Sequence, residues 1–333
     1  MAVKLAINGF GRIGRSVLRA LMETGRTDVE VVAINDLAPL ETLAHLFEFD
    51  SVHGRYTGSI IHADGTLDVG SGPIRVSAEA KPEILPWDEV DIVLECTGQF
   101  RDKDTARRHL QNGARRVLIS APATGEVKTI VFGINHDSIT ASDHIVSNAS
   151  CTTNCLVPVA QVLHGTFGIV RGHMTTVHSY NGNQSLHDAP HSDLYRARAA
   201  ALSMIPTTTG AANTLGQVLP DLAGRITGTA IRVPTPNVSC IDLVVETVAQ
   251  TSVGDINQVM ADAARGPLAG ILDVTDRKLV SIDLNHNPAS AIFASDQTSV
   301  QAGNLIRVLA WYDNEWAFSN RMLDTAAAMG RLL

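Results

Sequence analysis

Residues 3–23 have the sequence VKLAINGFGRIGRSVLRALME: a short apolar run, a glycine-rich turn and a stretch with helical spacing. The apolar run at residues 3–8 predicts a buried strand, and residues 12–23 predict an amphipathic helix. Further short strands are predicted at residues 29–35, 92–97, 116–120 and 144–148, and a further helix at 103–111. Because strands that alternate with helices pair into right-handed βαβ units, we predict a Rossmann-type, doubly wound parallel sheet in this part of the chain.

The rest of the chain is typical of a second domain with longer strands. A helix is predicted at residues 151–164, with Ser150 as its N-cap. Long strands are predicted at residues 170–178, 227–233, 238–248 and 305–312. We therefore predict an α/β protein whose second domain is α+β, with a largely antiparallel sheet. The boundaries are set at 1–149 and 150–316, and a closing helix at 317–333 is expected to pack back on the first domain.

The composition limits the location and the partners. The chain has 333 residues, about twice the size of a typical domain, with 26 basic and 34 acidic side chains and a formal net charge of −8. An acidic protein is a poor ligand for nucleic acid or for an anionic membrane surface. No apolar stretch approaches the roughly 20 residues that span a bilayer, and turn residues come too early for a signal peptide. Since four cysteines form no disulfide framework in so long a chain, the cytoplasm is the expected location.

The glycine-rich turn predicts a dinucleotide site. Gly9, Gly11 and Gly14 have the G-x-G-x-x-G spacing, after a strand and at the start of a helix, as this fingerprint requires. The first glycine makes the tight turn, the second lets a pyrophosphate approach the backbone, and the third lets helix and strand pack closely. The alternative is a glycine-rich turn with a structural role only.

Polar residues at the ends of other predicted strands extend this site. Asp36 lies near the expected offset for the acid that binds the adenosine ribose, and a carboxylate there repels a 2′-phosphate, which favours NAD over NADP. Thr97 and Ser120 end two more predicted strands, and the carboxyl ends of such strands line the ligand crevice. The alternative for Asp36 is a polar turn after the strand.

A cysteine at a helix start predicts nucleophilic chemistry. Cys151 lies in the first turn of the predicted helix, where the helix N-terminus stabilises a thiolate, so we expect a lowered thiol pKa. Cys155 is expected to pack behind it, a disulfide between the two being the less favoured alternative. His178, at a strand end, is the best-placed base among twelve histidines, although an ordinary structural histidine is the simpler interpretation. His187 and His191 lack a third ligand, so no metal site is predicted.

Four longer stretches carry a resemblance to a known family: INGFGRIGR (7–15), SNASCTTNC (147–155), RVPTPNV (232–238) and WYDNEW (311–316). With these, the chain resembles the phosphorylating glyceraldehyde-3-phosphate dehydrogenases from end to end. The resemblance implies an NAD-binding domain followed by a catalytic domain, in a homotetramer. It implies that Cys151 is the nucleophile and His178 its acid/base partner. Glyceraldehyde 3-phosphate would be oxidised through a hemithioacetal and a thioester, and inorganic phosphate would release the acyl phosphate.

The resemblance also assigns binding residues. It implies pyrophosphate contacts by Arg12 and Ile13 and a nicotinamide contact by Asn314. The phosphate contacts that it implies fall on residues beside the thiol and farther along the chain, namely Ser150, Thr152, Asn181, Arg196, Thr209, Gly210 and Arg232. Without the resemblance, residues 207–209 would be a polar turn and Arg196 part of a solvated helix face.

The chain departs from the family pattern at a few positions. Asn181 stands where the family often has a threonine that meets the substrate phosphate, and Asn183 where it often has an aspartate. An amide N–H can still donate to a phosphate. Ala189 replaces a leucine that helps to exclude a 2′-phosphate, and Ala80 replaces a basic residue near the adenine. We therefore expect NAD preference, set by Asp36, with some NADP tolerance.

Two other functions stay open. Erythrose-4-phosphate dehydrogenase is a close relative that shares the cysteine and the histidine, but it generally lacks the attacking-phosphate loop that this chain keeps at residues 208–212. A non-catalytic NAD- or RNA-binding regulator is less favoured, because the site residues are intact and the net charge is acidic.

Overall fold

The computed structural model describes residues 2–182 and 184–333, so Asn183 lies outside the described residues. By its internal contacts the chain divides into two compact units. Unit 1 contains the residues up to Ala149 together with Ser319–Leu333, and unit 2 is Ser150–Phe318.

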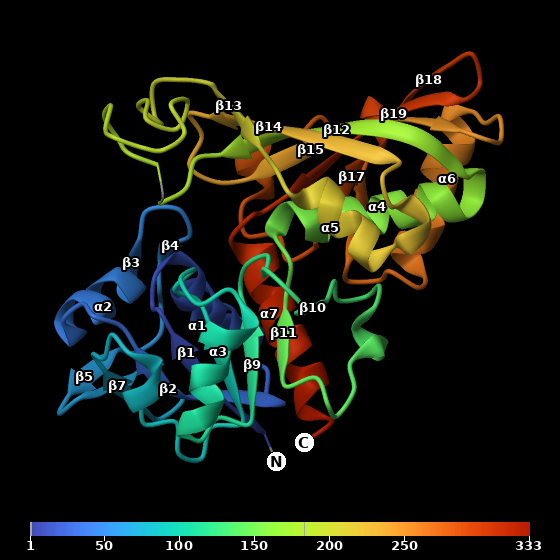
Figure 1. Cartoon of the computed structure of the whole chain (residues 1–333). Coiled ribbons are helices and arrows are strands. Elements are labelled where there is room, and N and C mark those ends of the chain that lie inside the picture. The colour runs from blue at the N-terminus through green and yellow to red at the C-terminus, as the bar shows by residue number, and fades with distance from the viewer. Residues whose placement is uncertain (1, 183) are drawn as a thin grey trace. The chain divides into compact units, whose positions relative to one another are not determined.

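Unit 1 is built on a mostly parallel sheet (Figure 1). The strand order is β10-β11-β9-β8-β1-β2-β7-β6-β5, in which the pairs from β10 to β7 are parallel and β6 and β5 form an antiparallel edge. The strands are β1 (Val3–Asn8), β2 (Val29–Asn35), β5 (Ile61–Ala63), β6 (Thr66–Asp68), β7 (Pro73–Ser77), β8 (Ile92–Glu95), β9 (Arg116–Ile119), β10 (Lys128–Thr129) and β11 (Ile145–Ser147), with a separate pair of β3 (Phe49–Asp50) and β4 (Gly54–Arg55). The strand order reverses between β1 and β8, which is where such sheets bind ligands.

The helices of unit 1 follow the predicted alternation. They are α1 (Arg12–Thr24), α2 (Leu40–Glu48), α3 (Lys103–Ala106) and most of α7 (Trp316–Gly330), with 3₁₀ turns at η1 (Pro82–Ile84), η2 (Arg107–Asn112) and η3 (His136–Ser138). The single helix predicted at 103–111 is wrong, because only its first turn is α-helical and the rest is 3₁₀. This tighter segment ends at Gly113, whose φ of 108° stops the helix.

Unit 2 contains a largely antiparallel sheet with helices on one face (Figure 1). The order is β13-β14-β12-β15-β19-β17-β16, with β18 also paired to β19, and only the β12–β14 and β16–β17 pairs of the described residues are parallel. The strands are β12 (Ile169–Ser179), β13 (Ile205–Thr208), β14 (Ile226–Val233), β15 (Ser239–Thr247), β16 (Leu272–Thr275), β17 (Ala291–Ala294), β18 (Ser299–Gln301) and β19 (Leu305–Tyr312). The helices are α4 (Cys151–Phe167), α5 (Ala211–Val218) and α6 (Val253–Arg265), with 3₁₀ turns at η4 (Pro220–Leu222), η5 (Ser281–Leu284) and η6 (Ser295–Gln297). The predicted fold class, a Rossmann-type sheet followed by an α+β domain, is confirmed.

The core of unit 2 holds α4 against the sheet. Leu156, Val159 and Leu163 of α4 are fully buried, as are Leu243 of β15 and Val308 of β19. Since β12 pairs with β15, the same unit holds both the start of α4, which carries Cys151, and the end of β12, which carries His178. Over the described part of the chain, no helix combines the length and the apolar character needed to cross a bilayer.

Candidate active site

A pocket of about 330 Å³ in unit 1 lies where the dinucleotide fingerprint predicts it. Its lining includes Gly9, Gly11, Asp36 and Thr97. The three glycines of the fingerprint differ in how much space a side chain would have. Gly9 has φ 93° and a Cβ there would meet the Thr97 nitrogen at 2.8 Å, whereas a Cβ on Gly14 would lie 2.2 Å from the Gly9 oxygen. A Cβ on Gly11 would meet nothing within 4 Å, so this backbone is open to a ligand.

Asp36 is held at the edge of this pocket. Its Oδ2 accepts a hydrogen bond from the Phe10 N–H at 2.8 Å, and its Oδ1 accepts one from the Ala38 N–H at 3.0 Å. Each carboxylate oxygen keeps a further lone pair, which can accept a ribose hydroxyl. The glycine turn, the start of α1 and this carboxylate are the donor and acceptor set that NAD requires, so the residues present fit that cofactor.

The predicted strand ends are shorter than expected. β8 stops at Glu95 and β9 at Ile119, so Thr97 and Ser120 lie in the loops that follow the strands. For β8 the physical reason is that Thr97 turns back, since both its N–H and its hydroxyl donate to the Glu95 carboxylate.

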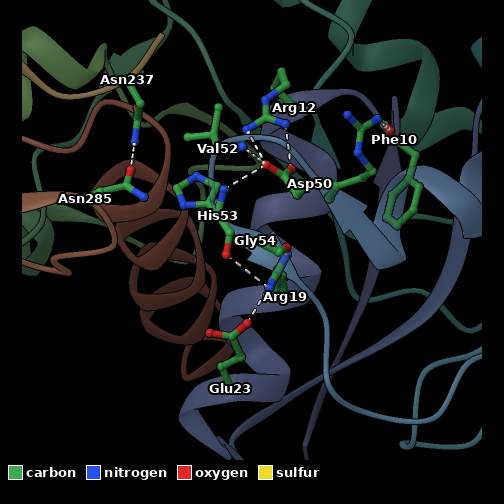
Figure 2. A network of polar contacts seen from close by, with 11 residues as sticks. Phe10, Arg12, Arg19, Glu23, Asp50, Val52, His53, Gly54, Asn237 and Asn285 are labelled. Carbon is green, nitrogen blue, oxygen red and sulfur yellow. Dashed lines mark hydrogen bonds and ion pairs between the residues drawn. The ribbon is translucent and has the colours of Figure 1, made fainter. Parts of the chain in front are cut away.

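Arg12, the first residue of α1, makes an ion pair inside unit 1 (Figure 2). Its Nη1 lies 2.6 Å from Asp50 Oδ2 and its Nη2 lies 3.2 Å from Asp50 Oδ1. Burial alone would raise the pKa of Asp50, but the hydrogen bonds from Arg12 and from the His53 and Val52 N–H groups lower it to about 2. Because the guanidinium is bound to Asp50, a pyrophosphate contact by Arg12 would come from its backbone, like that of Ile13.

In unit 2, Cys151 is the first residue of α4. The helix is capped by Ser150, whose hydroxyl oxygen accepts a hydrogen bond from the Thr153 N–H at 3.1 Å, so the predicted N-cap is confirmed. Ala149, with φ 58°, turns the chain into this cap. The thiol therefore lies at a helix N-terminus, beside the N–H groups of Cys151 and Thr152.

His178 lies at the end of β12, next to the thiol. Its Nε2 is 3.5 Å from Cys151 Sγ. Its Nδ1 is 2.5 Å from Arg232 Nη1 and 2.7 Å from the Ser179 carbonyl oxygen. A guanidinium only donates and a carbonyl only accepts, so each of these neighbours suits a different tautomer of the ring.

Burial sets the protonation of this pair. Burial, followed by the charge of Arg232, lowers the pKa of His178 to about 3, so the imidazole is neutral at pH 7. Burial also raises the pKa of the Cys151 thiol, against the opposing effects of Arg232 and of the N–H groups at the helix start. The expected lowering of the thiol pKa is therefore wrong for this site, because desolvation exceeds the stabilisation by the helix terminus.

A chain of hydroxyl groups, which the sequence did not predict, lies behind the thiol. Thr176 Oγ1 donates to the Cys240 carbonyl at 3.0 Å, and Tyr312 Oη lies 2.9 Å from both Thr176 Oγ1 and Thr152 Oγ1. Since the carbonyl only accepts, all three bonds form together only if Thr152 donates to Tyr312 and Tyr312 to Thr176. The Thr152 hydroxyl proton is thus engaged inside the protein.

Asn314 is oriented by two buried serines that sequence analysis also missed. Its Oδ1 accepts hydrogen bonds from Ser179 Oγ at 2.8 Å and from Ser239 Oγ at 2.9 Å. With the oxygen held in this way, the NH₂ end of the carboxamide points away from the serines. The only local signal for this role is that polar Ser179 and Ser239 occupy buried ends of strands.

The predicted phosphate residues of unit 2 are partly brought together. Arg232 faces the thiol, and the charge of Arg196 is near enough to lower the pKa of Arg232, after the larger effect of burial. Arg196 Nε donates to Thr207 Oγ1 at 2.9 Å. Gly210 is the N-cap residue of α5, which packs on α4, and Thr209 Oγ1 accepts from the Ala211 N–H at 3.2 Å.

Asn181 lies in the loop after β12. Its side-chain oxygen is buried and accepts no hydrogen bond from any residue that the structure describes. This geometry therefore does not place Asn181 with Arg196 and Arg232, and its predicted contact with the substrate phosphate stays a prediction.

A family model matches the sequence of each of the two units. The family model described as "Glyceraldehyde 3-phosphate dehydrogenase, NAD binding domain" matches residues 3–103, and the one described as "Glyceraldehyde 3-phosphate dehydrogenase, C-terminal domain" matches residues 150–314. The chain is 60% identical over 333 residues to a glyceraldehyde-3-phosphate dehydrogenase of Cereibacter sphaeroides and 61% identical over 334 residues to one of Xanthobacter flavus, with 100% of each chain covered. The chain belongs to the glyceraldehyde-3-phosphate dehydrogenase family.

The family resemblance inferred from the four motifs is thereby confirmed, and with it the expectation of an NAD-dependent dehydrogenase. A more distant glyceraldehyde-3-phosphate dehydrogenase, of Geobacillus stearothermophilus, is 52% identical over 330 residues, with 98% of each chain covered. The roles of single residues in this dehydrogenase stay predictions, because the comparisons concern whole domains.

Proposed function

We propose that this chain oxidises glyceraldehyde 3-phosphate to 1,3-bisphosphoglycerate, with NAD as the electron acceptor and inorganic phosphate as the second substrate. In this proposal residues 1–149 bind NAD and residues 150–316 carry the chemistry. The observation that supports it most is the 3.5 Å contact between Cys151 Sγ and His178 Nε2 at the start of α4.

The first steps use the thiol and the imidazole. We propose that the substrate phosphate draws Arg232 away from His178, so that Nδ1–H donates to the Ser179 carbonyl and the Nε2 lone pair faces the sulfur. His178 then takes the thiol proton while the sulfur attacks the aldehyde carbon. It passes that proton to the former carbonyl oxygen, which becomes the hydroxyl of the hemithioacetal. The N–H of Cys151 at the helix terminus stabilises the developing oxyanion.

Oxidation and release follow at the same sulfur. Bound NAD supplies the acceptor for the hydride, and Asn314 orients its carboxamide. His178 removes the hydroxyl proton as the hydride leaves, and a thioester results. An oxygen of inorganic phosphate then attacks the thioester carbonyl, the carbon–sulfur bond breaks, and His178 returns the proton to Cys151.

Two anions must be bound for this sequence. We propose that Arg196 and Arg232, whose mutual repulsion an anion would relieve, bind phosphate groups. The other proposed ligands are Ser150, Thr209, Gly210 and Thr152, the last through its backbone N–H because its hydroxyl proton is engaged with Tyr312. Asn181 is proposed as a further contact of the substrate phosphate. NAD is the preferred cofactor because of Asp36, with some tolerance for NADP.

The decisive experiment is NADH formation from glyceraldehyde 3-phosphate and from erythrose 4-phosphate, each with and without inorganic phosphate. We expect rapid turnover only with the triose, phosphate and NAD, and slower turnover with NADP. Turnover that is indifferent to phosphate would support the erythrose-4-phosphate alternative. NAD binding without any turnover would support a non-catalytic regulator, and preference for NADP would contradict the role of Asp36.

We further propose a homotetramer in the cytoplasm. Residues 186–204 of unit 2 expose Leu186, Leu194, Tyr195, Leu202 and Met204, and an exposed apolar segment of this kind is typical of a subunit interface. All four cysteines are free thiols, as expected in a reducing compartment. Sedimentation velocity should give about four times the chain mass, and a monomer at micromolar concentration would contradict the proposal.

A further inference from the structure

A buried carboxylate lies beneath the dinucleotide pocket. Glu95 ends β8, and its side chain is fully buried, as is that of His109, whose Nε2 lies 3.1 Å from Glu95 Oε2. The chemistry proposed above uses neither residue. A charged group in such a place is costly unless each of its oxygens is hydrogen-bonded.

The hydrogen bonds described for this carboxylate come from Asn8, His109 and Thr97, each acting as a donor. Trp87 Nε1–H donates to His109 Nδ1 at 2.9 Å, and since an indole only donates, the ring proton of His109 is on Nε2, facing Glu95. Asn8 Nδ2 donates to Oε2 at 2.7 Å, and Thr97 donates to Oε1 through its N–H at 2.8 Å and through its hydroxyl. The Glu95 side chain therefore accepts from Asn8, His109 and Thr97 at once, and it joins these three residues.

The network continues to the lining of the pocket. Asn8 Oδ1 accepts from Asn35 Nδ2 at 2.8 Å, which ties the carboxyl end of β1 to that of β2. Asn8, Asn35 and Thr97 all line the pocket, whereas Glu95, His109 and Trp87 lie behind it. Thr97 also packs closely against the glycine turn, because a Cβ on Gly9 would lie only 2.8 Å from the Thr97 nitrogen.

We propose that Glu95 is a positioning residue for dinucleotide binding. Its carboxylate holds the ends of β1 and β8 and the Thr97 loop at the point where the strand order reverses, and it thereby fixes the glycine turn in its binding geometry. Trp87 and His109 fix the carboxylate from the far side. The inference rests on the proposed NAD site.

The substitution Glu95→Gln tests the role of the charge. Glutamine keeps the shape and one acceptor for Thr97, but its NH₂ group faces the donors of Asn8 and His109. We expect the dissociation constants for NAD and for ADP-ribose, measured by calorimetry, to rise about ten-fold or more, because buried donors lose their acceptor. The Michaelis constant for NAD should rise in parallel while kcat changes by less than about three-fold.

Matched variants separate positioning from general destabilisation. The double variant Glu95→Gln/Asn8→Asp puts an acceptor opposite the new NH₂ group and should recover part of the lost affinity. Tyr56→Phe removes another buried hydrogen bond of unit 1, from Tyr56 Oη to the Val69 carbonyl at 2.8 Å, and should leave the dissociation constants unchanged. Iodoacetamide should alkylate Cys151 at the same rate in all of these proteins.

The outcomes are distinct. A lower melting temperature with unchanged NAD affinity in Glu95→Gln would overturn the inference, and so would equal losses in Tyr56→Phe. If Glu95→Gln does not fold, the variant Trp87→Phe decides. The indole N–H of Trp87 donates to His109 and to no pocket residue, so this variant disturbs the carboxylate only from behind. An unchanged NAD affinity in Trp87→Phe would again overturn the inference. If the unaltered protein binds no NAD, the proposed function fails first.

Discussion

Cys151→Ser should lower kcat for NADH formation by at least about 10⁴-fold. The site is built around a sulfur atom, at the start of α4 and within 3.5 Å of His178 Nε2. A serine hydroxyl is a far weaker nucleophile near neutral pH, and its oxygen ester would lack the reactivity that a thioester offers to phosphate. Steady-state rates with saturating NAD, aldehyde and phosphate measure the effect.

The control for this prediction is another thiol on the same helix. Cys155 is fully buried and packs toward β19, with its Sγ 3.9 Å from the Ala310 carbonyl oxygen. Cys155→Ala should change kcat by only a few-fold, and NAD affinity should be the same in both variants. Activity of Cys151→Ser within a hundred-fold of the unaltered protein would require a different nucleophile.

His178→Asn should lower kcat by roughly 10²–10⁴-fold, the usual contribution of a general acid/base. Asparagine can fill the space beside Arg232, but it cannot take a proton from the hemithioacetal. Unchanged binding of NAD would show that the variant is folded. A loss smaller than about ten-fold would assign the proton transfer to another group.

The same pair predicts an unusual pH dependence. Since the pKa of His178 is lowered to about 3, its imidazole stays neutral as the pH falls through 6.5 and is protonated only in strong acid. Since the pKa of Cys151 is raised, its thiolate appears only at a pH above that of an ordinary cysteine. Alkylation of the free protein by iodoacetamide should therefore show no inflection near 6.5 and should rise later than with a model thiol. An inflection at 6.5 would mean that the imidazole titrates in the accessible range.

Long, strongly patterned elements could be predicted from the sequence, and short or exposed ones could not. The predicted bounds of β1, β2 and β19 agree with the structure. β1 and β2 are mostly buried apolar runs, and in β19 buried residues alternate with half-buried ones, so each has a pattern that marks a strand. β5 was missed because all of its residues are exposed and no alternation marks it. β13 was missed because Pro206 argues against a strand, but β13 lies at the sheet edge, where proline is tolerated.

The residues of the candidate site also fall into those that the sequence could predict and those that it could not. Cys151 and His178 have local signals, a helix start and a strand end, that a sequence displays. Ser239 and Tyr312 act through contacts with residues far away in the chain, so no local pattern reveals them. The direction of the thiol pKa depends on how deeply the sulfur is buried, which sequence spacing does not give.

The last residues of the chain complete unit 1. Met322, Leu323 and Ala326 of α7 are fully buried, Thr325 donates to the Asn148 side chain at 2.7 Å, and a Cβ on Gly330 would lie 2.2 Å from a methyl group of Val3. A recombinant fragment that stops at Ala149 would thus lack α7 and, with it, part of the buried core of unit 1. A C-terminal truncation should therefore destabilise unit 1, the unit that carries the dinucleotide pocket. A minimal version of unit 1 has to combine residues from both ends of the chain.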